Sequence, residues 1–172
     1  ALCAEHFPEM RVCVCANLPY YITSPIIMKL LETNGCFESL TVMIQKEVAD
    51  RICAEAGSSD YGAITAAVAY RANAEKCFNV SPGNFIPPPK VTSTVVKMNM
   101  LKTPAASCKD PEKMFAIIKL AFGQRRKTLS NALSSEYEKA AVENALETLG
   151  FPRDVRGEKL SVFDFAALCD II

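Results

Sequence analysis

Short apolar runs alternate with segments of helical periodicity over the first third of the chain. Residues 11–16 and 40–44 are short and apolar, which is typical of buried strands. Residues 23–34 and 46–56 place apolar side chains three and four positions apart, as amphipathic helices do. The first helix is expected to begin with an N-cap residue directly before Pro25. This strand–helix–strand–helix order predicts an α/β fold with a parallel sheet.

Two further strands are predicted in the next part of the chain. Residues 63–72 fit a helix that passes into a strand over 74–80. Residues 93–100 alternate between apolar and polar positions, which indicates a last strand. Only a proline-rich loop separates these two strands, so we expect them to pair antiparallel.

The remaining pattern is helical and follows a linker over residues 101–110. Apolar stripes predict one helix from Pro111 and further short helices over residues 129–133, 140–149 and 162–171. We therefore expect two domains, with the sheet in residues 1–102 and a small all-α domain in residues 103–172.

The composition is that of a globular protein, since 50% of the 172 residues are hydrophobic and 22% are charged. No apolar run approaches the roughly 20 residues of a membrane-spanning helix. The 8 cysteines include no CxxC pair, so we expect buried, reduced thiols and a cytoplasmic location instead of a disulfide framework or a zinc site. The single histidine, His6, argues against histidine-based metal sites and Ser-His-Asp catalysis.

The quartet Asn17-Leu18-Pro19-Tyr20 follows the first predicted strand, and ligands of open α/β sheets bind at the carboxyl ends of strands. An exocyclic adenine amine is a weak nucleophile, and two acceptors would favour a more tetrahedral nitrogen. The Asn17 side chain and a nearby backbone carbonyl could supply them. Pro19 would stiffen the turn and Tyr20 would offer a face for an extruded base. The alternative is an ordinary strand-to-helix turn, in which Asn and Pro are common.

The quartet resembles the amine-binding motif of the ribosomal RNA small-subunit adenine N6-dimethyltransferases. Residues 43–51 resemble the next strand and helix of that family, residues 85–93 its second substrate loop, and residues 122–129 a basic segment of its C-terminal domain. Order and spacing agree over nearly the whole chain. The resemblance implies the later strands of a Rossmann-like methyltransferase sheet, with the last pair antiparallel, followed by the all-α domain.

The resemblance also implies roles for individual residues. Asn17 and the Leu18 carbonyl would hold the adenine N6 in a turn stiffened by Pro19. Tyr20 would stack on the base and Phe85 would approach its other face. Asn17 would also lie beside S-adenosylmethionine, the methyl donor.

Phe85 and Tyr21 have alternative roles, and the residue before the motif differs from the family. Phe85 could instead be buried beneath the proline-rich loop, and we expect Tyr21 to be structural. Ala16 replaces the glycine that usually precedes the motif in the family.

The Gly-rich turn that binds the donor in this family has no counterpart here, because no two of the 7 glycines are separated by a single residue. The chain starts at the position of the family's fourth strand, and three β–α units, about 90 residues, have no counterpart upstream. We therefore expect a truncated fragment that is inactive by itself. Its unpaired sheet edge is expected to be covered by self-association.

From Lys119 to Lys127, both included, there are four basic residues and no acidic residue, although the 19 basic and 19 acidic residues of the whole chain cancel. An RNA-binding surface must therefore come from local clustering. The resemblance implies that Arg125, Arg126 and Lys127, together with Lys90, dock ribosomal RNA phosphates. A solvated helix face is the alternative.

The function implied by the resemblance is S-adenosylmethionine-dependent dimethylation of two adjacent adenosines in small-subunit ribosomal RNA or a pre-ribosomal particle. Two alternatives stay open. A large-subunit resistance methyltransferase shares the amine motif, and a non-catalytic assembly or transcription factor could keep the fold for RNA binding. Modification of a protein glutamine or a DNA adenine fits less well with the second loop and the helical tail.

Overall fold

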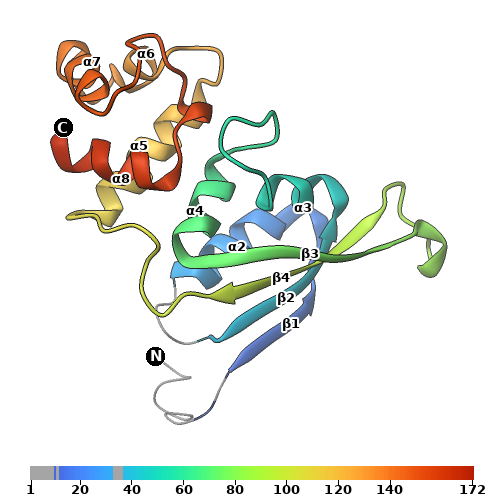
Figure 1. Ribbon diagram of the computed structural model, residues 1–172. Helices are drawn as coiled ribbons and strands as arrows, with labels where there is room; N and C mark the ends of the chain where they lie inside the picture. The colour runs from blue at the N-terminus through green and yellow to red at the C-terminus, as the bar shows by residue number, and fades with distance from the viewer. Residues whose placement is uncertain (1–9, 11, 33–36) are drawn as a thin grey trace. The chain divides into compact units, whose positions relative to one another are not determined.

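The computed structural model describes residues 10, 12–32 and 37–172 (Figure 1). Contacts divide the chain into two compact units, and each is described by itself. The first unit holds the residues up to Cys53 together with Arg71–Pro104, and the second holds Ala54–Tyr70 together with Ala105–Ile172. This division differs from the expected boundary at residue 102, because residues 54–70 group with the C-terminal helices and not with the sheet.

The first unit contains a four-stranded mixed sheet in the order β1-β2-β4-β3. The strands are β1 (Cys13–Asn17), β2 (Ser39–Gln45), β3 (Ala72–Val80) and β4 (Ser93–Met100). β1 and β2 are parallel, whereas β4 is antiparallel to both of its neighbours. The predicted strands and the antiparallel last pair are confirmed. The sequence did not indicate that β4 would lie between β2 and β3.

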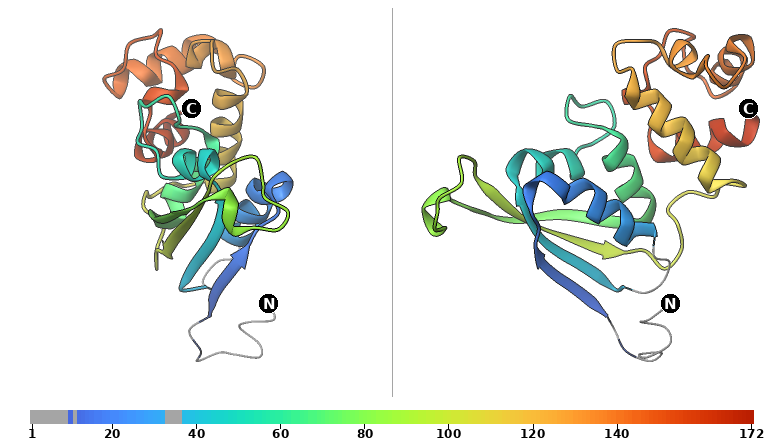
Figure 2. Two further views of the ribbon diagram at one scale, coloured as in Figure 1. Left: turned by 90° about the vertical axis from the view of Figure 1, so that its right-hand side faces the viewer. Right: turned by 180° about the vertical axis from the view of Figure 1, so that it is seen from behind.

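The helices α2 (Thr23–Glu32) and α3 (Lys46–Ile52) cover one face of this sheet (Figures 1 and 2). Leu40 pairs with Met98 and Val42 pairs with Val96, and all four side chains are fully buried on that face. Pleating then directs the intervening residues of both strands to the opposite face. The predicted end of the first helix, near residues 34–35, lies outside the described residues.

β1 is an edge strand of the described sheet, and one of its faces is open. Cys13, Cys15 and Asn17 are exposed, and the residues between them are half-buried. Val14 pairs with Leu40 and therefore points toward the helices, so the three exposed side chains lie on the opposite face.

The expectation of buried thiols is wrong for Cys13, Cys15 and Cys77, which are all exposed. The two cysteines of β1 share one face as predicted, but that face of the strand is not covered by the described residues. Cys3 and Cys36 lie outside the described residues.

The second unit is helical and has its own core. It contains most of α4 (Ala63–Arg71) with α5 (Pro111–Gly123), α6 (Leu129–Leu133), α7 (Lys139–Thr148) and α8 (Val162–Ile171). Tyr70, Met114 and Phe165 are among its fully buried side chains. No helix of the described residues has the length and apolarity to cross a membrane.

Side-chain caps explain where two of these helices begin. Asp110 accepts a hydrogen bond from the Lys113 amide directly before Pro111, the first residue of α5. Ser161 and Asp164 form a reciprocal capping box at the start of α8. The helices that the sequence predicts in this region are therefore confirmed nearly residue for residue.

Candidate amine-binding turn and basic segment

The turn over residues 17–20 lies at the carboxyl end of β1, where the sequence places it. Asn17 ends the strand and pairs with Met43 of β2. The Leu18 amide then donates to the Met43 carbonyl at 3.1 Å, which continues the contact with β2 beyond the strand. Because the Leu18 side chain is buried, the main chain is held at this point from two directions.

A second anchor holds the Pro19 carbonyl. It accepts hydrogen bonds from the Thr23 hydroxyl at 3.1 Å and from the Ile22 amide at 3.2 Å. Helix α2 begins at Thr23, two residues before the expected first helical residue Pro25. The main chain is thus fixed on both sides of the Leu18 carbonyl, the proposed amine acceptor.

A third anchor holds the Tyr20 side chain. Its hydroxyl shares a hydrogen bond of 2.6 Å with the hydroxyl of Ser93, a fully buried residue at the start of β4. Tyr20 as a whole is half-buried. Its neighbour Tyr21 is 86% exposed, so its side chain is not part of the core.

The Asn17 side chain is exposed, and through its pairing with Met43 it lies on the face of the sheet opposite the helices. An Asn17 side chain directed into the core would have excluded contact with a substrate. The turn instead presents an exposed amide side chain. The segment that follows it is held by the hydrogen bonds at Leu18, Pro19 and Tyr20. Such an arrangement can offer two oxygens to the two N–H bonds of an amine.

Phe85 lies in the loop over residues 81–92, which joins β3 to β4 and extends beyond the sheet (Figure 1). Pairing of Val80 with Ser93 closes the loop at its base. The Phe85 amide donates to the Pro82 carbonyl at 3.2 Å, and its ring is half-buried, whereas Ile86 is fully exposed. Phe85 is therefore not a fully buried plug beneath the loop.

An ion-pair cluster near this loop escaped the sequence analysis. Asp50 of α3 accepts hydrogen bonds from Lys46 at 2.6 Å and from Lys76 of β3 at 2.8 Å. These two bonds hold the pKa of the Asp50 carboxyl below its ordinary value. The Lys46 amide also donates to the Thr92 carbonyl of the loop at 2.9 Å. Asp50 thus links α3 to β3 next to the base of the loop.

The basic segment forms an exposed turn between α5 and α6, and not a helix face. Arg125 has a structural role there. It donates to the Ser59 carbonyl at 2.8 Å and to the Tyr61 carbonyl at 3.2 Å, and it lies 3.9 Å from Glu158. Within the described part of the chain, the side chains of Arg126 and Lys127 show no such contacts.

The loop over residues 54–62, which accepts both hydrogen bonds of Arg125, contains a residue of the core. Tyr61 is 3% exposed, and its ring meets that of Phe122 edge-on at 5.6 Å. Burial raises the pKa of Tyr61 to about 12, and the nearby Asp164 carboxylate adds to the effect. The two hydrogen bonds of Arg125 thus join the loop, through its main chain, to the turn that follows α5.

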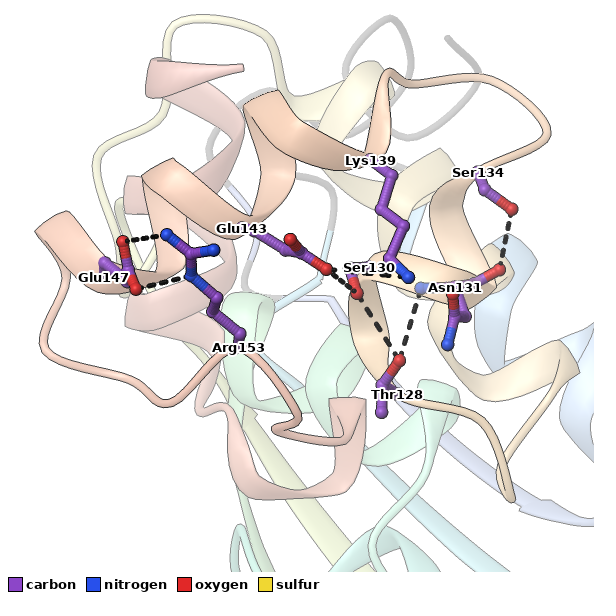
Figure 3. Close-up of polar contacts among 8 residues, drawn as sticks. All are labelled: Thr128, Ser130, Asn131, Ser134, Lys139, Glu143, Glu147 and Arg153. Atoms are coloured by element: carbon purple, nitrogen blue, oxygen red, sulfur yellow. Dashed lines mark hydrogen bonds and ion pairs between the residues drawn. The ribbon is translucent and has the colours of Figure 1, made fainter.

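Polar contacts fix the start of α6, directly after the basic turn (Figure 3). The Thr128 hydroxyl accepts a hydrogen bond from the Asn131 amide at 3.4 Å and caps the helix. Ser130 donates to Glu143 of α7 at 3.2 Å, and Lys139 lies 3.7 Å from the same carboxylate. The basic turn is therefore followed directly by a helix whose start is held by hydrogen bonds.

The fold and the turn together define a Rossmann-like α/β domain with a candidate amine-binding site at a strand end. The family model for ribosomal RNA adenine dimethylase matches residues 4–172. The chain belongs to that family, as its sequence motifs implied.

Curated relatives agree with this assignment. The ribosomal RNA small subunit methyltransferase A of Alkaliphilus oremlandii is 46% identical over 172 residues, covering 98% of this chain and 60% of the relative. The protein of the same name from Caldanaerobacter subterraneus is 45% identical over 170 residues, covering 98% of this chain and 63% of the relative. The chain thus spans about 60% of the length of such relatives.

Two solved structures resemble this one. A dimethyladenosine transferase from Plasmodium falciparum superposes with a TM-score of 0.77 at 27% identity, over 94% of this chain and 66% of that one. The 23S rRNA methyltransferase ErmE superposes with a TM-score of 0.66 at 23% identity, over 94% of this chain and 65% of that one. The second likeness concerns the fold alone.

We expect replacement of Arg125 to destabilise the protein far more than replacement of its neighbour. Arg125→Ala removes two hydrogen bonds from a charged donor and should lower the free energy of unfolding by about 1–3 kcal/mol. Arg126→Ala is the matched control and should stay within about 0.5 kcal/mol of wild type. Urea unfolding measures both changes. Equal stability of the two variants would contradict the structural role of Arg125.

Proposed function

We propose that the complete protein methylates the N6 nitrogen of adenosines in ribosomal RNA, using S-adenosylmethionine, with two adjacent adenosines of the small-subunit RNA as targets. The observation that carries this proposal is the exposed Asn17 side chain at the end of β1. It lies beside a turn that is held by hydrogen bonds at Leu18, Pro19 and Tyr20. The names of the bacterial relatives support the choice of the small subunit.

The chemistry assigned to the turn follows from its acceptors. The Asn17 side-chain oxygen would accept one N–H of the adenine amine, and the Leu18 carbonyl would accept the other. Two such bonds favour a pyramidal nitrogen whose lone pair is available for attack. Tyr20 would support one face of the flipped base and Phe85 the other. No strong base is required, because positioning and fixed dipoles supply the rate enhancement.

S-adenosylmethionine supplies an electrophilic methyl group when it is bound. Asn17 fits a contact to this donor, because its amide is accessible at the carboxyl end of an edge strand, the position at which open α/β sheets bind ligands. We assign no other residue of this chain to the donor.

Replacement of Asn17 tests the proposed chemistry. In the complete protein, Asn17→Ala should lower kcat for methyl transfer to unmethylated small-subunit RNA by roughly 100-fold, since one pre-organised polar contact of the reacting group is lost. Asn73→Ala is the matched control, because Asn73 is an exposed strand residue of β3, and it should keep wild-type kinetics. Unchanged kcat for Asn17→Ala would contradict the proposal.

Mapping the methylated nucleotides in the same assay separates the alternatives. Modification of large-subunit RNA would favour the resistance type, although the likeness to ErmE concerns the fold alone. A complete protein that binds RNA and never methylates it would favour the non-catalytic class. The described cysteines are free, which is in line with the cytoplasmic location that we also propose.

We further propose that the helical part of the chain, residues 103–172 with the loop over 54–62, docks the RNA. Arg126 and Lys127 are exposed on the turn directly before Thr128, the N-cap of α6. Lys90 is exposed in the proposed substrate loop over residues 81–92. These cations suit phosphate contacts, whereas Arg125 would contribute chiefly by holding its loop.

Salt dependence measures the phosphate contacts. Arg126→Ala combined with Lys127→Ala should weaken RNA binding and lower the slope of log K against log salt by about 1–2, because up to two phosphate contacts are lost. Glu112→Ala and Lys113→Ala, on the same helical unit but at the start of α5, form the control pair. An unchanged slope would remove these two residues from the RNA interface.

The open edge of β1 supports the proposal that this chain self-associates. The strand pairs with β2 alone in the described sheet, and its exposed side chains include two cysteines. Unpaired strand edges favour pairing with another chain. Light scattering of the 172-residue chain under reducing conditions should show a species larger than the 18.8 kDa monomer at high concentration. A single monomeric species would contradict this proposal.

A further inference from the structure

Ser93 is the residue at which three parts of the candidate site meet. As the first residue of β4, it pairs with Gln45 at the end of β2 and with Val80 at the end of β3. Its hydroxyl meets the Tyr20 hydroxyl at 2.6 Å. The pair with Val80 closes the loop that carries Phe85, and the hydroxyl contact holds the amine-binding turn.

The hydroxyl of Ser93 is not needed for packing. The side chain is fully buried, and an alanine would fill the same strand position without requiring a partner. A buried hydroxyl must form a hydrogen bond to avoid a loss of stability, and here its bond goes to Tyr20, a residue 73 positions away in the sequence. The contact therefore serves the placement of Tyr20.

A bond at the phenolic oxygen fixes the ring of Tyr20 at its far end. The main chain holds the near end, because the turn is anchored at Leu18 and Pro19. A change of the χ1 rotamer would carry the hydroxyl several Å from Ser93 and break the bond. The ring is thus held at one distance from the base of the Phe85 loop.

We propose that Ser93 is a positioning residue for the target adenine: it sets the place of the Tyr20 ring relative to the loop that carries Phe85. This inference rests on the proposed function of the turn. Ser93 itself does not touch the base, and it acts through Tyr20. Its loss misaligns a base that still binds, so the effect falls on kcat and not on KM.

The experiment compares Ser93→Ala, Ser93→Thr, Tyr20→Phe and the double variant Ser93→Ala/Tyr20→Phe in the complete protein with unmethylated small-subunit RNA. Ser93→Ala and Tyr20→Phe should each lower kcat roughly fivefold, the factor that corresponds to one lost hydrogen bond, with KM nearly unchanged. The double variant should be no slower than either single variant, because both remove the same bond. Ser93→Thr keeps the hydroxyl and should restore most of the rate.

A second readout follows the base directly. RNA that carries 2-aminopurine at the target position should lose fluorescence when the base stacks on Tyr20, and Ser93→Ala should weaken this quenching at saturating protein. Thr94→Val is the control, because Thr94 also has a buried hydroxyl, which bonds Asn79 at 2.8 Å on the other face of the sheet. It should keep wild-type kcat and quenching.

The outcomes separate this inference from the function on which it rests. An active wild type whose kcat is unaffected by Ser93→Ala, or by Tyr20→Phe if Ser93→Ala fails to fold, would overturn the role of Ser93 alone. Rate losses that multiply in the double variant would do the same. A wild type that never methylates RNA would overturn the proposed function, and this inference with it.

Discussion

The hydrogen bond from the Leu18 amide to the Met43 carbonyl determines where the candidate site lies. It continues the pairing of β1 with β2 beyond Asn17, so the following turn cannot swing away from the sheet. The Thr23 and Ser93 hydroxyls then hold the Pro19 carbonyl and the Tyr20 ring. With these contacts in place, the main chain that carries the Leu18 carbonyl is held beside the exposed Asn17 side chain before any substrate arrives. Such pre-organisation is what a weak nucleophile requires.

The basic residues have different roles in a chain whose acidic and basic residues cancel. Arg125 donates its hydrogen bonds to the loop over residues 54–62, whereas Arg126 and Lys127 stay exposed on the same turn as Arg125. In the other unit, Lys46 and Lys76 both bond Asp50 beside the base of the loop over residues 81–92. Local arrangement thus matters more than the total.

Features that depend on neighbours in the sequence could be predicted. Apolar periodicity located the helices and strands, including the start of α5 at Pro111, and the quartet from Asn17 lay at a strand end as expected. Features that depend on distant partners could not. The place of β4 between β2 and β3 depends on the order of the strands in the sheet. The hydrogen bond between Tyr20 and Ser93, and the one from Arg125 to the Ser59 carbonyl, each join residues more than 60 positions apart. The exposure of Cys13 and Cys15 likewise depends on whether anything covers β1.

The most direct test of the central claim is a crystal structure of the complete protein with an RNA that presents its target adenosine and a non-reactive analogue of the methyl donor. The distances to measure run from the adenine N6 to the Asn17 side-chain oxygen and to the Leu18 carbonyl oxygen. Both should be about 3 Å, with the base against the Tyr20 ring. An N6 beyond about 4 Å from either oxygen, or a base bound elsewhere, would contradict the claim.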